Sequence, residues 1–254
     1  MRKKRGKFKI EEFIKKDKKD KKKYIIFKSK KIRVPSNIIK ELHTAYKYKE
    51  VLNKFIVEYI SKIKEKSYED SNSKILNLIN NFKKNYIEKV MPSKLLENPK
   101  NLYHMSGATD FSQIQLLLRS LSTTMGNFWE KIALTSNLAI STEVEFGIKI
   151  TGIDIIFIEN KKPTYAQIKT MEGTLTGSQK PRSEKELLLH QNKYFVAVFE
   201  TGSGWTFHSD KIKKLKGKEF WSLINLDYDY ILKEVKLMIK EIQDAYYQAK
   251  PTKN

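Results

Sequence analysis

Apolar residues recur at helical spacing through the first half of the chain. From Ile38 to about Lys66 they fall every three or four positions, and the same spacing returns over residues 74–90 after a polar gap. Met91-Pro-Ser follows this second stripe, and a proline disfavours helix in the residue before it. The pattern therefore predicts two amphipathic helices, the second of which ends at Met91.

The second half of the chain begins with helical spacing and then changes to the alternation of strands. Residues 111–138 predict one long helix or two, and Val144 to Ile150 alternates apolar with polar side chains. A β-prone run at 153–158 and a hairpin-like connection, Asn160-Lys-Lys-Pro163, lead into a second strand at 164–170. Further strands are predicted at 194–200 and 205–208, and further helices within 171–192, at 217–225 and at 228–248.

Glycine divides the sequence in the same way. None occurs between Gly6 and Gly107, and the other eight lie between Gly126 and Gly217. A long glycine-free stretch suits helices, whereas glycine-bearing segments suit strands joined by tight turns. We expect an α/β protein with three parts: a basic N-terminal arm (1–35), a helical region for dimerisation or DNA binding (36–110), and a sheet-bearing region (111–254).

The charge of the chain indicates a polyanionic partner. Fifty basic residues against 29 acidic ones give a net charge of +21, of which residues 1–35 contribute +13. Such a surplus favours phosphate contacts and counterion release. The first 35 residues either grip phosphates or form a solvated tail. A membrane surface is the competing partner, but no basic amphipathic helix with a leucine or aromatic face supports it.

Other compositional features exclude several classes of site. Cysteine is absent, which excludes disulfides, a thiol nucleophile and cysteine-based metal centres. The four histidines form no i, i+4 pair, so a histidine-rich zinc site is not expected. No apolar run follows the basic start Met1-Arg-Lys-Lys-Arg, and none reaches the length of a membrane span. The expectation is a cytoplasmic protein.

Three chemically useful side chains fall on the two strands joined by the predicted hairpin. Asp154 lies near the start of the first strand, and Gln167 and Lys169 lie two positions apart on the second. Period-two geometry places Gln167 and Lys169 on one face and Ile168 on the other. If the strands pair as a hairpin, Asp154 lies close to that face, and a carboxylate, an amide and an ammonium converge.

These groups suit hydrolysis of a phosphodiester. A carboxylate and a backbone carbonyl, here that of Ile168, are oxygen ligands for a hard divalent cation such as Mg²⁺, which activates water and neutralises charge on the phosphate. A lysine near the scissile phosphate orients the water and stabilises the transition state. Taken singly, an aspartate at a strand start is usually structural and a lysine on a strand is usually solvated.

Taken together, Asp154 and the pair Gln167 and Lys169 resemble the PD-(D/E)xK nuclease superfamily, which includes most type II restriction endonucleases. The resemblance covers about 120 residues, from the helix at Ser120 to the helix after Phe220. It implies a restriction-endonuclease-like core, a central mixed sheet flanked by helices, over 111–254, and Mg²⁺ as cofactor with Mn²⁺ as a substitute. Two departures stand out, because Ile153 replaces the proline and Gln167 replaces the second acid.

The replaced acid leaves metal binding to Asp154 and another carboxylate. Met125-Gly-Asn-Phe-Trp-Glu130 resembles the upstream helix of the superfamily, whose glutamate points toward the metal, so Glu130 is the first candidate. The alternative for Glu130 is a surface position on an amphipathic helix. Glu145, expected on the preceding strand, is the reserve, and Glu159 is expected to be solvated in the turn.

The loop after Lys169 resembles the segments that restriction enzymes bring to DNA. Ser178, Gln179, Lys180 and Arg182 are its candidate contacts, and a bidentate arginine is the commonest reader of guanine. The segment Gly217-Lys-Glu-Phe-Trp-Ser-Leu-Ile224 resembles one found in restriction enzymes cutting GGNCC-type sites. Lys218 is therefore a further phosphate contact, with Phe220 and Trp221 in the core.

The resemblance implies a prokaryotic homodimer that binds double-stranded DNA, each subunit cutting one strand of a (pseudo)palindromic site. A cognate DNA methyltransferase would act on the same site without binding this chain. Two alternatives stay open. One is a junction resolvase or repair nuclease of the same superfamily. The other is a non-catalytic nucleic-acid-binding protein in which Asp154 is structural.

Overall fold

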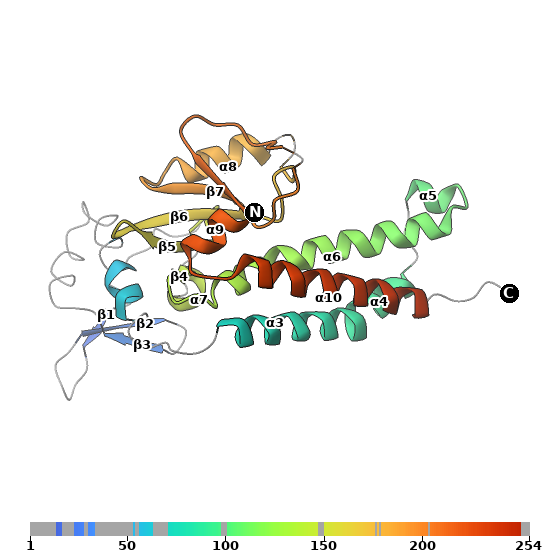
Figure 1. The fold of residues 1–254 in the computed structure, drawn as a ribbon, viewed down its shortest axis with the longest axis horizontal. Helices are drawn as coiled ribbons and strands as arrows, with labels where there is room; N and C mark the ends of the chain where they lie inside the picture. Colours follow the sequence, from blue (N-terminus) through green and yellow to red (C-terminus); the bar gives the residue numbers. More distant parts are fainter. Residues whose placement is uncertain are drawn as a thin grey trace, which may run out of the picture.

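A computed structural model describes residues 14–16, 23–27, 30–33, 53, 56–62, 71–97, 101–146, 150–175, 177, 179–202 and 204–249. Over these residues the chain is α/β, as predicted, with a five-stranded mixed sheet flanked by helices and a separate three-stranded sheet (Figure 1). Helices extend away from the larger sheet as a long arm, drawn to the right in Figure 1.

The basic N-terminal segment contributes the smaller sheet. Its strands pair in an antiparallel meander; they are β1 (Ile14–Lys16), β2 (Lys23–Phe27) and β3 (Lys30–Arg33). Helical residues at 53 and 56–62 fall in the first predicted helix, whose other residues lie outside those described. The segment therefore adopts β structure where it is described.

The arm is built from helices that pack side by side (Figure 1). They are α3 (Ser71–Asn85), a π-helical turn (Tyr86–Val90), α4 (Met91–Leu96), α5 (Leu102–Met105), α6 (Thr109–Ala133) and α10 (Tyr228–Ala249). The predicted helix end at Met91 is wrong. Pro92 lies in the first turn of α4, where a missing N–H breaks no helical hydrogen bond, so the helical path continues to Leu96.

The larger sheet has the order β4-β5-β6-β7-β8. β5 and β6 form the predicted hairpin, whose turn residues Asn160 and Lys161 both have positive φ, as a tight two-residue hairpin turn requires. The last three strands, β6, β7 and β8, run parallel. The strand bounds are β4 (Ala139–Ile140), β5 (Ile155–Glu159), β6 (Lys162–Lys169), β7 (Lys193–Ala197) and β8 (Lys213–Lys216).

Two predicted strands are wrong. Where Val144 to Ile150 alternates, the chain forms the short helix α7 (Thr142–Phe146), and residues 147–149 lie outside those described. Residues 205–208 form no strand, and β8 lies at Lys213–Lys216 instead. The Lys-Lys-Leu-Lys sequence of this edge strand has one apolar side chain, so its pairing with β7 leaves no hydrophobic pattern to detect.

The two faces of the larger sheet pack against different elements. Ile168 belongs to the main core with residues of α6, α10 and α9 (Gly217–Leu223). The opposite face carries a smaller core with Phe195 and Leu187, the last residue of α8 (Gln179–Leu187). Because Gln167 pairs with Phe195 in the parallel register, it faces α8. None of the described helices is long and apolar enough to cross a membrane.

Candidate active site at one edge of the sheet

A glycine turn leads into the strand that follows Asp154. Gly152 has φ +76°, a backbone conformation that residues other than glycine rarely adopt. A Cβ atom at this position would lie 2.2 Å from Oε2 of Glu186 on α8, so the position has no room for a side chain. The Asp154 segment therefore touches α8 at this turn.

The Asp154 carboxylate takes the place of a backbone carbonyl in the sheet ladder. The Asp154 N–H donates to the Ala166 carbonyl at 2.9 Å, and the Ile168 N–H donates to Oδ2 of Asp154 at 2.6 Å. The hydrogen bond from Ile168 fixes the position of the carboxylate. The predicted hairpin thus places Asp154 against β6 between Gln167 and Lys169.

The Ile168 carbonyl points toward the same side of β6 as the Asp154 carboxylate. Along a strand successive carbonyls point to alternate neighbours. The Ala166 carbonyl accepts from Asp154, whereas the Lys169 carbonyl accepts from Val198 at 2.8 Å, on the side of β7. Alternation therefore directs the Ile168 carbonyl past the start of β5, where it is available as a second oxygen donor.

Gln167 holds a buried polar atom that no described residue satisfies. Its side chain is only 7% exposed, and Oε1 accepts no hydrogen bond within the part of the chain that the structure describes. A buried acceptor left in this state costs about 1–3 kcal/mol. Such an atom calls for a partner such as a cation or an ordered water.

Lys169 ends β6, on the same face as Gln167, and is half-buried. The next residue, Thr170, accepts a hydrogen bond from Nε1 of Trp129 at 3.1 Å. This bond brings the last turns of α6 to the end of β6, and the neighbouring Glu130 is half-buried. The described residues contain no group of three or more His, Asp or Glu side chains placed to hold a metal ion.

The reserve carboxylate Glu145 and the turn carboxylate Glu159 both have partners. Glu145 lies on α7 and not on a strand, and its Oε2 accepts from the Tyr59 hydroxyl at 2.5 Å. Burial and this hydrogen bond raise the pKa of Tyr59. Glu159 is half-buried at the end of β5 and accepts from the Tyr194 hydroxyl at 2.9 Å, so the expectation of a solvated side chain is wrong. Burial, followed by Glu159, raises the pKa of Tyr194 to about 12.

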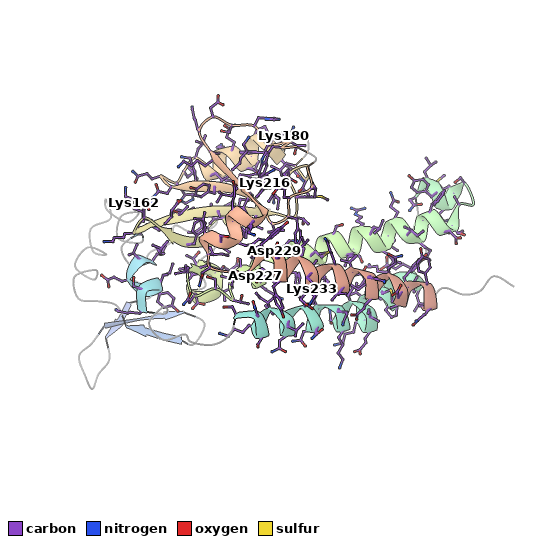
Figure 2. All side chains as sticks on the ribbon, viewed as in Figure 1. Lys162, Lys180, Lys216, Asp227, Asp229 and Lys233 are labelled. Carbon is purple, nitrogen blue, oxygen red and sulfur yellow. The ribbon has the colours of Figure 1, made fainter. Side chains whose placement is uncertain are left out.

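The candidate DNA-contacting residues lie mainly on α8, next to β6. Gln179 is exposed, Lys180 is half-buried, and the position of Ser178 lies outside the described residues. The Arg182 side chain is 74% exposed and pairs with Glu186 through Nε at 2.9 Å, an interaction that raises the pKa of Arg182. Figure 2 shows Lys180 on this side of the sheet.

Lys218 lies on α9, away from α8. Its Nζ pairs with Asp229 at 3.2 Å, and both side chains are 71% exposed. An exposed pair of this kind contributes little to stability and opens readily. Phe220 and Trp221 are fully buried, as the sequence predicts.

Sequence reasoning missed a buried carboxylate in the loop after Lys169. Glu172 is 1% exposed and accepts hydrogen bonds from the Thr201 N–H at 3.1 Å and the Thr201 hydroxyl at 2.7 Å. Lys216 lies 3.9 Å away and pairs with Glu200 at 2.6 Å (Figure 2 labels Lys216). Burial pushes the pKa of Glu172 up, but the hydrogen bonds and Lys216 outweigh it and hold the pKa below its usual value.

These groups meet because β6, β7 and β8 are parallel and their carboxyl ends share one edge of the sheet. Lys169, Glu200 and Lys216 each end or follow one of these strands. Ligands of open α/β sheets bind beyond the carboxyl ends of strands. The edge combines oxygen donors with ammonium groups, an arrangement suited to a cation and a phosphate held together.

Replacing Glu172 with glutamine is expected to lower the free energy of unfolding at neutral pH by about 1–3 kcal/mol, because the N–H and hydroxyl of Thr201 lose a charged acceptor. The folded-state pKa of Glu172 is below its usual 4.5. Its contribution is therefore present above that pH and lost as pH falls through the folded pKa. Urea unfolding across pH 3–7 should show a shallower acid limb in Glu172→Gln.

Glu200→Gln is the matched control. It removes the other carboxylate that pairs with Lys216, but the Glu200 side chain is 50% exposed and its loss should change stability little. Equal effects of the two substitutions would contradict a special role for the buried carboxylate.

Comparison with known proteins gives no identification. No model of a known protein family matches the chain, and no curated protein matches it.

Proposed function

We propose that this protein is a divalent-metal-dependent endonuclease of the type II restriction class, acting on double-stranded DNA, with the larger sheet and its helices as a restriction-endonuclease-like core. One observation carries the proposal. The Asp154 carboxylate, the unsatisfied oxygen of buried Gln167 and the end-of-strand Lys169 occupy a single edge of the sheet.

The donors at this edge fit Mg²⁺. Asp154, the Gln167 amide oxygen and the Ile168 carbonyl offer three hard oxygen ligands of the kind that Mg²⁺ and Mn²⁺ prefer. The neutral Gln167 fits in particular, because burying an amide next to Asp154 avoids the repulsion between two carboxylates. Glu130 would complete the set from α6. When bound, the metal would activate water and neutralise charge on the scissile phosphate.

The chain's own residues would supply position and charge. The Ile168 N–H holds the Asp154 carboxylate in place. Lys169 would donate to an oxygen of the scissile phosphate and orient the attacking water, stabilising the charge that builds up during attack. The Trp129 bond to Thr170 fixes the end of β6, and so limits the movement of the Lys169 backbone.

The net charge of +21 supports DNA as the substrate. Gln179, Lys180 and Arg182 lie on the helix that faces the catalytic strand, so DNA bound at the sheet edge would lie within their reach. Opening of the exposed Arg182–Glu186 pair would free the guanidinium for a guanine edge. Two copies of the chain would cut the two strands of a symmetric site.

Incubation of the purified protein with phage or unmethylated plasmid DNA, in Mg²⁺ or in EDTA, tests the proposal. We expect discrete bands on a gel in Mg²⁺ and intact DNA in EDTA. A metal-dependent smear would point to a structure-directed or nonspecific nuclease. DNA that is retarded but intact under both conditions would overturn the catalytic roles of Asp154 and Lys169 and indicate a binding protein.

A further inference from the structure

The far end of the helical arm carries large apolar side chains in solvent. Met105 on α5 is 82% exposed, and Phe111 and Leu118 on α6 are 66% and 59% exposed. Leu102 on α5 adds a fourth at 75%. Isolated apolar side chains are common on surfaces, but a contiguous group of this size marks an interaction site.

The exposed side chains form one surface. Phe111, Ile114 and Leu118 follow i, i+3, i+7 spacing, so they share a face of α6. The ring of Tyr103 lies edge-on to Phe111, with centroids 6.2 Å apart. Ile114, Leu118 and Tyr247 of α10 line an apolar groove of about 330 Å³. We name this surface, composed of Tyr103, Phe111, Ile114, Leu118 and Tyr247, the apolar tip.

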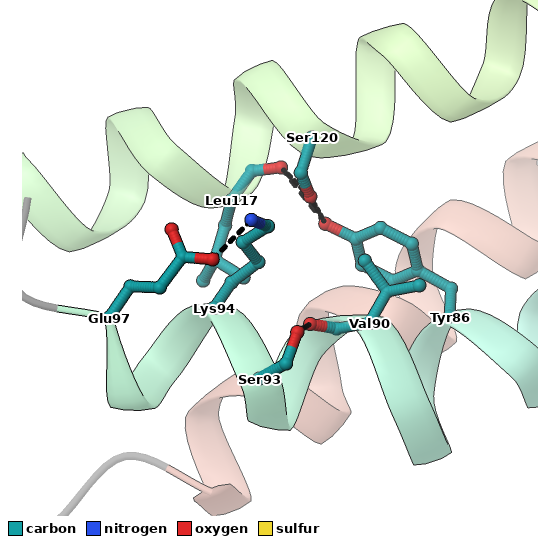
Figure 3. Close-up of polar contacts among 7 residues, drawn as sticks. All are labelled: Tyr86, Val90, Ser93, Lys94, Glu97, Leu117 and Ser120. Atoms are coloured by element: carbon teal, nitrogen blue, oxygen red, sulfur yellow. Dashed lines mark hydrogen bonds and ion pairs between the residues drawn. The ribbon is translucent and has the colours of Figure 1, made fainter.

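Hydrogen bonds hold the base of the groove in place (Figure 3). The Tyr86 hydroxyl donates to the Leu117 carbonyl at 2.9 Å and lies 2.9 Å from Oγ of Ser120, which ties the π-helical turn to α6. Tyr86 and Leu117 both line the groove and are buried. The groove is therefore preformed, and a partner that fills it pays little reorganisation.

Charge separates the apolar tip from the rest of the chain. The 36 residues from Met91 to Gly126 hold three basic and two acidic residues, a net charge of +1, although the whole chain carries +21. Lys94 and Glu97, two of these five, pair with each other (Figure 3). A surface with so little net charge does not attract nucleic acid or an acidic partner. The same neutral, apolar surface on a second copy of the chain complements it.

We infer that the apolar tip is the contact between two copies of this chain, with α6 packed antiparallel against α6 of the partner. In a two-fold contact each copy contributes the same surface, so that surface must be complementary to itself. It therefore needs both a protruding side chain and a groove that receives the same side chain of the partner. Phe111 is the protruding side chain, and the groove begins at Ile114. Antiparallel packing centred near Ile114 places Phe111 of each copy against the partner's Leu118 and its groove.

The size and position of the surface fit this occupant. Together with Leu102 and Met105, its exposed side chains supply on the order of 800 Å² per copy, the share that each side of a standard interface buries. Phe111 lies 18 residues from Trp129, roughly 27 Å along α6 at 1.5 Å per residue, so the two sheet edges stay far from the contact. The contact does not depend on any chemistry at the sheet edge.

Light scattering after size exclusion tests the contact in the absence of DNA. We expect the mass of a dimer for the wild-type chain at tens of micromolar, and the mass of a monomer for Phe111→Glu combined with Leu118→Glu. Both side chains are exposed, so the variant should keep its circular dichroism spectrum and melting temperature. Leu237→Glu, at a 47% exposed position of α10 that does not line the groove, is the control and should remain dimeric.

Because the chain contains no cysteine, a single introduced cysteine gives a second test, which detects the contact without having to disrupt it. Ile114→Cys should give a covalent dimer with a short bis-maleimide, because this position lies near the two-fold axis, whereas Leu237→Cys should stay monomeric on a denaturing gel. A monomeric wild-type chain, a dimer that survives the double glutamate substitution, or equal cross-linking at both cysteines would overturn the inference. None of these results bears on metal-dependent cleavage, which is measured separately.

Discussion

Replacing Asp154 with asparagine is expected to reduce metal-dependent DNA cleavage by at least about 1,000-fold while leaving DNA binding intact. Asparagine keeps a side-chain oxygen to accept the Ile168 N–H, so the junction between β5 and β6 should hold. It removes the negative charge that would attract the cation. Gel retardation and cleavage, measured on the same protein preparation in Mg²⁺, separate the two effects.

Asp210→Asn is the matched control, because Asp210 is an exposed aspartate outside the sheet edge and its loss should leave the cleavage rate within twofold. Melting temperatures of both variants guard against misfolding. Cleavage by Asp154→Asn at the wild-type rate would contradict the metal-binding role. Loss of cleavage together with loss of the native melting transition would show that Asp154 is needed for the fold instead.

The part of the site that lies on the β5–β6 hairpin could be predicted from the sequence, because its geometry is local. The hairpin was predicted with the four-residue connection Asn160–Pro163, but the turn is shorter, because Asn160 and Lys161 alone close it and β6 begins at Lys162. Alternation along the strand then sets which face Gln167 occupies. The closeness of Asp154 to β6 follows from these short-range rules, whereas its contact with the Ile168 N–H was not predicted.

Groups that meet across parallel strands could not be predicted in this way. Glu172 contacts Thr201, 29 residues later, only because β6 and β7 lie side by side and their following loops meet at one edge. No periodicity encodes that neighbour relation. Sequence reasoning also placed Glu145 on a strand, because Val144, Phe146 and Ile148 alternate with polar residues. Over so short a segment this alternation does not distinguish a strand from a short helix.

The burial of the Gln167 side chain could not be predicted from the sequence either. The residue type and its spacing to Lys169 suggest a ligand, but only the packing of α8 over this face buries the amide and leaves its oxygen without a partner among the described residues. A glutamate here would place a second negative charge in the same buried space. Burial therefore gives a physical reason for the departure from the acidic pattern.

Replacing Lys169 with methionine is expected to lower the cleavage rate by about 100-fold or more, with little change in metal or DNA affinity. Methionine keeps the length and apolar stem of the half-buried lysine, so β6 and the Thr170 contact with α6 should persist. What is lost is the ammonium that would stabilise charge on the phosphate during attack. Single-turnover kinetics at saturating protein separate this loss from weaker binding.

Lys162→Met is the control on the same strand, because Lys162 is exposed at the opposite end of β6 from Lys169 (Figure 2). It removes one unit of the same charge from the same strand, so any general electrostatic effect on DNA affinity appears in both variants. A decrease of less than tenfold in Lys169→Met, or an equal decrease in both variants, would contradict a role at the scissile phosphate. A large decrease confined to Lys169→Met would tie the chemistry to the edge where Asp154 and Gln167 lie.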